Sequence, residues 1–207
     1  MINELMKRYP VLEWCRTEIE GTAQILMESF RNGGKLLTCG NGGSAADSGH
    51  IVGELMKGFI LKRPLPSAEQ EKLCEMFPEE GKKIAAQLQG ALPAISLPDQ
   101  TALLTAFVND VAADMMYAQL VYGYGCAGDV LLGISTSGNS ANVLNAARVA
   151  KFKGMKVIAL AGEKACKLDE LADIVIHVPA GKTHEVQELH LPVYHALCAW
   201  CEAESFS

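Results

Sequence analysis

Residues Asp129 to Val143 read DVLLGISTSGNSANV and contain the clearest local pattern in the chain. Val130 to Ile134 form a short apolar run bounded by polar residues, which is typical of a strand buried on both faces. Ser135 to Ser140 are small, and five of these six residues carry a hydroxyl or a carboxamide. A helix is predicted from Ala141 to Lys151, so the stretch predicts a strand, a polar loop and a helix in succession.

The polar loop has the composition of an anion-binding site. A loop between a strand and a helix directs free backbone N–H groups, and the positive end of the helix dipole, toward one point. No cationic residue lies in the loop, so amides and hydroxyls would hold the anion, as they hold a phosphate in a backbone nest. Serine-rich loops also form plain solvated turns with a serine N-cap, and the residues alone leave both interpretations open.

A second unit of the same kind lies earlier in the chain. Lys35 to Cys39 are predicted as a strand, Gly40 to Ser44 as a loop, and Ala45 to Lys57 as a helix. The loop has neither GxGxxG spacing nor a GKS or GKT ending, so it supports neither a dinucleotide site nor a P-loop.

The remaining chain continues the alternation of strands and helices. Further strands are predicted at 93–97, 155–161 and 173–178, and further helices at 2–31 with a break at Pro10, 100–124 in two pieces, 140–153, 166–171 and 183–205. This alternation predicts a three-layer α/β fold, in which a five-stranded parallel sheet is flanked by helices. Ligands of such sheets bind at the carboxyl ends of the strands, where the Asn41 and Ser135 loops are both expected.

Residues 65–92 interrupt this rhythm. A capping-box pattern at Ser67–Gln70 predicts one short helix, and Glu79–Leu88 predicts another. We interpret the segment as a helical insertion into a single domain of residues 1–207, rather than as a second domain.

Composition limits the class of protein. The chain has 207 residues, of which 49% are hydrophobic, and this length suits one domain with a core. A net charge of −6 argues against nucleic acid or an anionic membrane as the main partner. No apolar run reaches membrane-spanning length.

The cysteines predict a reducing compartment. Seven cysteines are an odd number with no framework spacing, and Met1–Glu4 does not begin a signal peptide, so we expect a cytoplasmic protein with free thiols. Cys198 and Cys201 form a CxxC pair late in an apolar helix. We interpret this pair as core packing rather than as a redox motif.

Two pairs of polar residues are candidates for chemistry. His50 and Glu54 are four residues apart on one helical face, where they could ligate a metal, act as an acid/base pair, or form a simple surface hydrogen bond. Gln187 and His195 lie about 12 Å apart along the last helix and differ by about 80° in direction. They reach one ligand only if they lean together or if Pro192 bends the helix.

The spacing of Gln187 and His195 otherwise predicts two sites. The simplest arrangement that unites them with His50 and Glu54 is a subunit that lends part of its last helix to a neighbour. We therefore expect a symmetric homo-oligomer, most simply a tetramer, in which Glu54 and His195 of one site come from different chains.

Other polar residues have simpler interpretations. His184 and His190 lie close to Gln187 and are alternative candidates for its role. His177 ends a strand and is predicted to be structural, and Asn109–Asp110 lies at a helix junction where capping is the simplest role.

Three segments resemble a known family. CGNGGS at 39–44, the stretch at 129–143 and QELH at 187–190 are similar to the sugar isomerase (SIS) domain, and within it to the phosphoheptose isomerases. The resemblance implies a flavodoxin-like five-stranded parallel sheet and a tetramer with sites between subunits. It implies an aldose–ketose isomerase that converts sedoheptulose 7-phosphate to D-glycero-D-manno-heptose 7-phosphate.

The resemblance also implies roles for individual residues. The expected sugar and phosphate contacts are Asn41, Gly42, Gly43, Asn109, Asp110, Ser135, Thr136, Ser137, Ser140 and Gln187. The expected zinc ligands are His50, Glu54, Gln187 and His195. Glu54 and His195 also match the acid/base pair of the family.

The chain departs from the family pattern in four places. Gly58 replaces an arginine, His184 replaces an aspartate, Pro192 lies within the last helix, and the segment 65–92 is longer. These departures concern the substrate more than the reaction type, and another phosphosugar is an alternative. A non-catalytic SIS adapter that associates with a replication initiator is a second alternative, but such adapters replace the residues that correspond here to Glu54 and His195.

Overall fold

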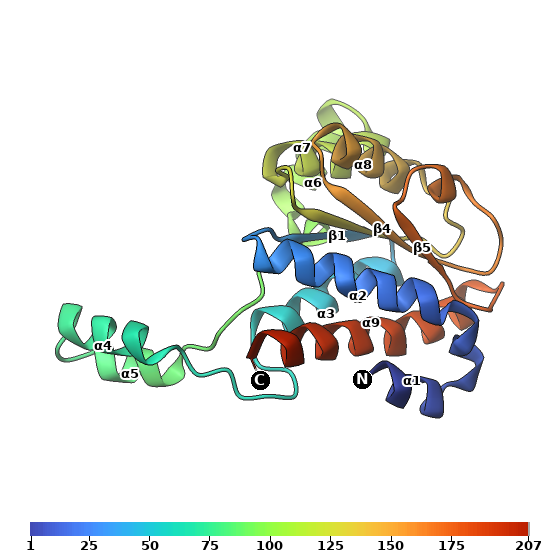
Figure 1. Ribbon diagram of the computed structural model, residues 1–207. Coiled ribbons are helices and arrows are strands. Elements are labelled where there is room, and N and C mark those ends of the chain that lie inside the picture. Colours follow the sequence, from blue (N-terminus) through green and yellow to red (C-terminus); the bar gives the residue numbers. More distant parts are fainter. Residues whose placement is uncertain (207) are drawn as a thin grey trace.

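The computed structural model describes residues 1–206 and has a three-layer α/β architecture (Figure 1). Its five strands are all parallel and lie in the order β2-β1-β3-β4-β5. The strands are β1 (Leu36–Gly40), β2 (Ala94–Ser96), β3 (Val130–Ile134), β4 (Lys156–Ala161) and β5 (Ile174–His177). The predicted fold class is therefore confirmed.

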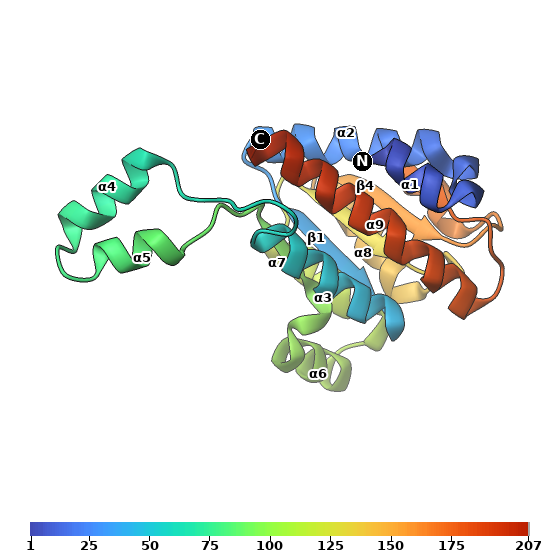
Figure 2. The same ribbon diagram turned by 90° about the horizontal axis from the view of Figure 1, so that it is seen from below.

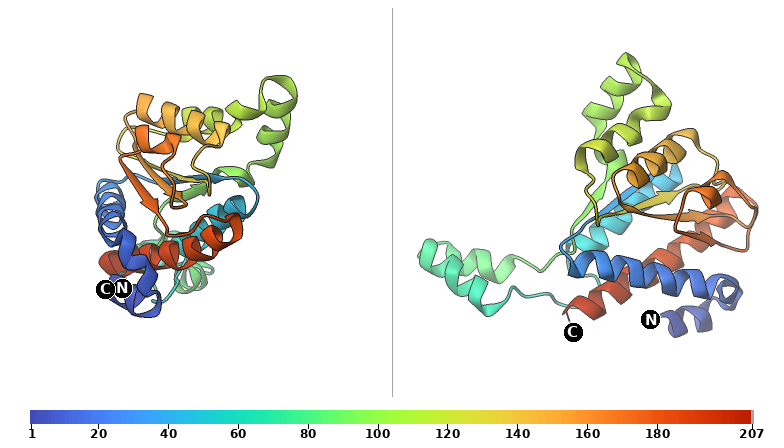
Figure 3. Two further views of the ribbon diagram at one scale, coloured as in Figure 1. Left: turned by 90° about the vertical axis from the view of Figure 1, so that its right-hand side faces the viewer. Right: turned by 45° about the horizontal axis from the view of Figure 1, so that its top comes forward.

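Helices cover both faces of the sheet (Figure 3). One face carries α1 (Ile2–Arg8), α2 (Arg16–Arg31), α3 (Gly43–Met56) and α9 (Thr183–Phe206). The opposite face carries α6 (Thr101–Asp110), α7 (Met116–Tyr124) and α8 (Ala141–Phe152). Short 3₁₀ turns are η1 (Pro10–Cys15), η2 (Leu97–Asp99), η3 (Ala113–Met115) and η4 (Lys167–Glu170).

The strands are apolar throughout because alternate residues fill two cores. In β3, Val130, Leu132 and Ile134 join the core beneath α2, α3 and α9, whereas Leu131 joins the core beneath α7 and α8. A strand covered on both faces has no polar side, which explains the continuous apolar run in the sequence. Cys198 and Cys201 are fully packed on α9, which confirms the packing interpretation of the CxxC pair.

The order of the strands creates a switch point between β1 and β3. The chain leaves β1 through α3 toward β2, and it leaves β3 through α8 in the opposite direction, toward β4. The two helices also lie on opposite faces (Figure 1). The carboxyl ends of β1 and β3 therefore flank the crevice where ligands bind in sheets of this kind.

A helical arm projects away from the body (Figure 2). The arm comprises residues 65–88 and contains α4 (Ser67–Met76) and α5 (Gly81–Gln87), which contact each other. No residue of α4 is buried. The predicted capping box is wrong, because α4 begins at Ser67 itself and Pro66 occupies the N-cap position without a side-chain hydrogen bond.

The base of the arm is closed by backbone and side-chain hydrogen bonds. Pro64 and Gln89 form an antiparallel bridge, and the N–H of Gly90 donates to the carbonyl of Arg63 at 2.7 Å. Arg63 is fully buried and pairs with Glu202 of α9 at 2.8 Å. Among residues 1–206, no helix is both long enough and apolar enough to cross a membrane.

Candidate active site

Two loops meet at the switch point of the sheet. Asn41 follows β1, and its side-chain amide exchanges two hydrogen bonds, of 2.9 and 2.8 Å, with the amide of Asn142 in the first turn of α8. This reciprocal pair fixes the first loop against the second. The sequence analysis missed Asn142, whose only signal is an amide in the first turn of the helix that follows the serine-rich loop.

The serine-rich loop has the geometry of an anion site. The Ser135 and Ser140 hydroxyls lie 3.1 Å apart, and Gly138 takes a φ of +63° in a turn whose N–H donates to the Ser135 carbonyl. Within residues 1–206, no hydrogen bond uses the backbone N–H of Thr136, Ser137 or Ser140. Ser140 is the N-cap of α8, where the helix dipole favours an anion, and Thr136 and Ser137 belong to the loop that leads to it.

A pocket of about 300 Å³ opens beside this loop, and a lysine lies in its lining. Its lining includes Thr136, Ser137 and Lys164. Lys164 follows β4, the neighbouring strand, so the topology brings it to a loop that has no cation of its own. The sequence analysis missed Lys164, because its position depends on the strand order.

Gln187 lies against the first loop. A Cβ atom built on Gly43 would approach the Gln187 side-chain nitrogen to 2.5 Å, so a side chain at this position would displace the Gln187 amide. Gly42 has a φ of +56°, which also favours glycine. Asn41, Gly42, Gly43 and Gln187, which were predicted to contact the sugar, are thus neighbours in space.

Glu54 and His195 come together within one chain. The His50 Nε2 atom lies 3.3 Å from a Glu54 oxygen and 3.4 Å from the Nε2 atom of His195. The prediction that Glu54 and His195 must come from different chains is therefore wrong. The reason is that α9 packs along α3 in the same direction, so that Gln187 meets the start of α3 and His195 meets its middle.

A hydrogen-bonded chain fixes the tautomer of His50. The Tyr194 hydroxyl donates to Asp47 at 3.1 Å, so its oxygen accepts from the Nδ1–H of His50 at 3.0 Å. The Nε2 lone pair of His50 then faces Glu54 and His195. Sequence reasoning missed Tyr194 and Asp47, which support the site only through the packing of α9 on α3.

The burial of this group is reflected in its pKa values. Burial, followed by the nearby Asp47 carboxylate, raises the pKa of Tyr194. Burial and the adjacent His50 lower the pKa of His195, although Glu54 acts in the opposite direction. Both ionisable side chains therefore favour their neutral forms at neutral pH.

His50, Glu54 and His195 were predicted to be metal ligands. Within residues 1–206 their ligand atoms do not all lie within 4.8 Å of one another, so they would have to move closer together to hold one ion. Two imidazole nitrogens and a carboxylate oxygen are donors that zinc prefers. Gln187 was predicted to be the fourth donor, and the structure places its amide against Gly43 instead.

Other predicted residues lie apart from this group. Asn109 and Asp110 end α6, where both are exposed and hydrogen-bonded to each other at 2.8 Å. None of the hydrogen bonds between described residues joins them to either loop. His184 is exposed, whereas His190 is buried and its pKa is lowered to about 4 by that burial.

The departure at Gly58 has a local reason. A Cβ atom at this position would lie 2.5 Å from the carbonyl oxygen of Leu61, so the turn admits only glycine. Lys57 brings its amine to 3.4 Å from Glu54, so a cation still stands beside this carboxylate.

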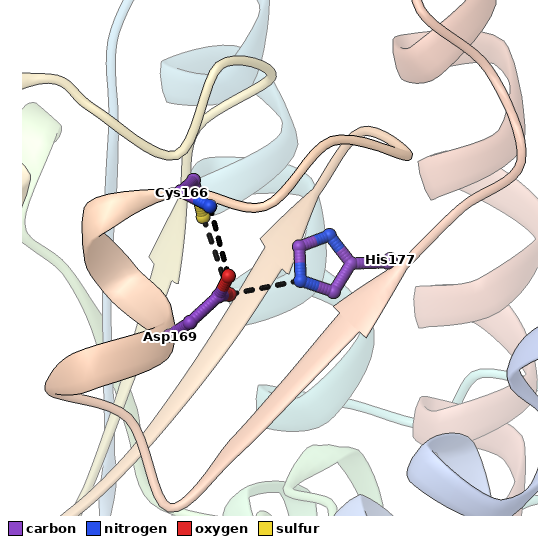
Figure 4. A group of neighbouring side chains, drawn as sticks. All are labelled: Cys166, Asp169 and His177. Atoms are coloured by element: carbon purple, nitrogen blue, oxygen red, sulfur yellow. Dashed lines mark hydrogen bonds and ion pairs between the residues drawn. The ribbon is translucent and has the colours of Figure 1, made fainter.

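A second cluster joins η4 to the end of β5 (Figure 4). An Asp169 oxygen lies 2.8 Å from the Nε2 atom of His177 and accepts a hydrogen bond from the thiol of Cys166 at 3.4 Å. Ligand atoms of all three residues lie within 4.8 Å of one another, which is compatible with a metal ion.

Comparison with known proteins agrees with this architecture. The SIS domain family profile matches residues 2–73 and 72–162. The phosphoheptose isomerase of Rhodospirillum rubrum is 38% identical over 188 residues, covering 91% of this chain and 86% of that protein. That of Thiobacillus denitrificans is 41% identical over 183 residues, covering 87% of this chain and 80% of that protein.

Solved structures give the same result. The phosphoheptose isomerase of Neisseria gonorrhoeae superposes with a TM-score of 0.76 at 32% identity, covering 97% of this chain and 94% of that one. That of Francisella tularensis superposes with a TM-score of 0.75 at 27% identity and with the same coverage. The chain therefore belongs to the SIS domain family, in which its relatives are the phosphoheptose isomerases.

Proposed function

We propose that this protein is an aldose–ketose isomerase that converts sedoheptulose 7-phosphate to D-glycero-D-manno-heptose 7-phosphate. The observation that carries the proposal is that His195 of α9 meets His50 and Glu54 of α3, the helix that leaves the first loop at the switch point of the sheet. The names of the related proteins support the same reaction.

Separate sets of residues bind the phosphate and the sugar of the substrate. The phosphate binds the free N–H groups of Thr136, Ser137 and Ser140, together with the hydroxyls of this loop that include Ser135. The sugar hydroxyls bind Asn41, Gly42, Gly43 and Gln187. Asn109 and Asp110 complete the sugar contacts from a neighbouring subunit.

Two groups move the protons. Glu54 removes a proton from the carbon next to the carbonyl, and His195 donates one to the carbonyl oxygen, which gives an enediol. The reverse transfers at the other carbon give the product. A neutral His195 Nε2 suits this role, because the same nitrogen must give and take a proton in one turnover.

We propose zinc as the metal of this site, bound by His50, Glu54 and His195, with Gln187 as the fourth donor when it turns from Gly43. A bound zinc ion would polarise the carbonyl oxygen of the substrate. Coordination lowers the basicity of a carboxylate and occupies the lone pair of an imidazole nitrogen, so Glu54 and His195 would not serve as zinc ligands and as the acid/base pair in the same step.

The proposal includes the setting of the enzyme. Residues 1–207 act as one SIS domain, with N-terminal helices at 2–31 and an insertion at 65–92. The protein works in the cytoplasm as a homo-oligomer, most simply a tetramer with shared sites, and takes neither nucleic acid nor membrane as a partner. Free cysteines and an exposed α6 without a buried residue support this setting.

The test is turnover of purified protein with sedoheptulose 7-phosphate, followed by NMR, alongside a panel of other phosphosugars. Glu54→Gln should abolish turnover and leave phosphosugar binding largely intact. Glu188→Gln is the matched control, because Glu188 is exposed on α9, and it should keep wild-type turnover. Binding without turnover of any sugar by the wild-type protein would favour the non-catalytic adapter, and retained turnover in Glu54→Gln would move the base elsewhere.

A further inference from the structure

Cys166, Asp169 and His177 form a cluster that the proposed reaction does not use (Figure 4). Cys166 precedes η4, Asp169 lies within it, and His177 ends β5, so the sheet brings together residues distant in sequence. The Asp169 oxygen Oδ1 lies 2.8 Å from the His177 Nε2 atom and 3.4 Å from the Cys166 sulfur. Three different donor types therefore face one point.

The hydrogen bonds of His177 direct one lone pair into this cluster. The Nδ1 atom lies 2.6 Å from the carbonyl oxygen of Gly162, which can only accept, so Nδ1 carries a proton. In the neutral ring the Nε2 lone pair then faces a carboxylate oxygen, which is also an acceptor. A proton or a metal cation has to lie between them, and an N–H bond to a backbone carbonyl is the usual support of a metal-binding histidine.

The arrangement does not suit a nucleophilic thiol. In a cysteine–histidine–carboxylate triad the imidazole stands between the thiol and the carboxylate. Here the carboxylate stands between the other two groups. Burial, together with the neighbouring Asp169, also raises the pKa of the Cys166 thiol, which opposes a free thiolate.

The distances match a small metal ion. Tetrahedral zinc with ordinary bond lengths separates an oxygen from a nitrogen donor by about 3.3 Å, and an oxygen from a sulfur donor by about 3.6 Å. The observed separations of 2.8 and 3.4 Å need to open by up to about half an ångström. The Cys166 sulfur and the His177 nitrogen, which lie within 4.8 Å of each other, need to come to about 3.6 Å. A pocket of about 380 Å³ adjoins the cluster, and Glu18 and Glu163 contribute to its lining and favour a cation there.

We infer that Cys166, Asp169 and His177 bind one divalent borderline cation, for which zinc is the best chemical match, with solvent as the fourth ligand. A thiolate excludes magnesium and calcium as preferred ions, and nitrogen with oxygen completes a zinc-like donor set. This site is separate from the site of His50, Glu54 and His195. Its residues follow β4 and end β5, whereas the other three residues lie on α3 and α9.

The site would also support the serine-rich loop. The N–H of Leu168 donates to the carbonyl of Gly138 at 3.3 Å, and the N–H of Lys167 donates to the side chain of Asn139 at 3.0 Å. A Cβ atom built on Gly138 would collide with Cys166, so this loop and η4 are in direct contact. A cation that fixes Cys166 and Asp169 therefore also fixes the support of the loop.

The test uses cobalt(II) as a spectroscopic substitute for zinc. A cobalt–thiolate bond gives a near-ultraviolet charge-transfer band, whereas cobalt bound to His50, Glu54 and His195 gives none, because that group lacks sulfur. Metal-depleted wild-type protein titrated with cobalt should develop this band until its intensity corresponds to one thiolate-bound cobalt per chain, and zinc should remove it. Absence of the band in the wild type overturns the inference.

Single substitutions test whether Cys166 supplies the thiolate that binds cobalt. Cys166→Ser keeps an oxygen at the N-cap of η4, so it should fold, and it should lose the band. Cys126→Ser is the matched control, because Cys126 is also accessible on a loop, and it should keep the band. His177→Gln should weaken cobalt affinity by more than about 100-fold, since loss of an outer partner alone weakens metal affinity by about 10–100-fold. A band that survives in Cys166→Ser, or that disappears in Cys126→Ser, overturns the inference.

Discussion

Glu202 closes the turn that follows α3. Its two oxygens accept the N–H groups of Phe59, Ile60 and Leu61 at 2.8–3.0 Å, and they accept the Nε–H of Arg63 at 2.8 Å. Arg63 has no exposed side-chain surface, and its remaining nitrogens donate to the carbonyls of Leu55 and Glu54. One carboxylate therefore ties the last helix to the end of the helix that carries Glu54.

Replacing Glu202 should lower the free energy of unfolding of the protein. Glu202→Gln keeps the shape of the side chain but leaves the Arg63 charge buried without its partner, and such a loss lowers the free energy of unfolding by about 3–5 kcal/mol. Urea unfolding at pH 7 measures it. Glu204→Gln is the control, because it removes only an exposed pair with Arg31 and should change stability by less than about 1 kcal/mol. Equal losses in the two variants would contradict this account of Glu202.

The same carboxylate should make stability depend on pH. Burial acts to raise the pKa of Glu202, but the three backbone N–H groups and Arg63 outweigh it, so that its pKa in the folded protein is lowered. The stabilisation is then complete above the unfolded pKa of about 4.3 and is lost as the pH falls through the folded pKa. Urea unfolding of the wild type and Glu202→Gln from pH 7 to 3 should give curves that converge at the acid end. A constant difference between them would contradict a lowered pKa.

At the scale of elements, the strands were predictable and the contacts between helices were not. β1 and β3 lie within one residue of their predicted positions. Both were predictable because a short apolar run that ends at glycine or serine is typical of a buried strand and is too short for a helix. The His50–Glu54 pair was predictable because it lies on one turn of helix. Tyr194, Asn142 and Lys164 were not, since their positions depend on the direction of α9 and on strand order.

The two helices of the arm were predicted close to their observed bounds, and only the cap of the first was predicted wrongly. Ser67 has the pattern of an N-cap, but Pro66 before it has a fixed backbone angle and takes that position instead. The break around Asn109 and Asp110 was predicted, and α6 does end at Asp110 before a 3₁₀ turn.

The arm should be removable without loss of the fold. Pro64 and Gln89 are bridged as neighbours on antiparallel segments, so a two-residue Asn-Gly turn can replace residues 65–88. The free energy of unfolding should change by less than about 1 kcal/mol, because no residue of α4 is buried. Urea unfolding of both proteins at one concentration measures it.

Glu202→Gln provides the control for this replacement. Its partners Phe59, Ile60, Leu61 and Arg63 all lie outside the arm, so the change should destabilise the shortened chain as much as the full one. A loss of several kcal/mol on removal of the arm would show instead that the arm packs on the body.

At the scale of the whole molecule, the site residues fall into two groups. Glu54, His50 and His195 converge inside one chain, beneath the carboxyl end of the sheet. Asn109 and Asp110 end α6, which stands away from this group (Figure 2). Leu103 and Val108 of α6, and Val111 directly after it, are exposed. Exposed apolar residues beside two polar groups are typical of a surface that packs on another subunit.

Mixing inactive subunits should therefore restore activity in one combination only. Glu54→Gln mixed with His195→Ala should stay inactive, because every chain then lacks one member of the same group. Glu54→Gln mixed with Asp110→Asn should recover about one quarter of wild-type activity, since in a symmetric oligomer of equal composition that fraction of sites combines an intact Glu54 from one chain with an intact Asp110 from another. Native mass spectrometry confirms that mixed oligomers have formed, and phosphosugar turnover gives the activity. Recovery in the first mixture would place Glu54 and His195 in different chains after all, and no recovery in the second would remove Asp110 from the neighbouring site.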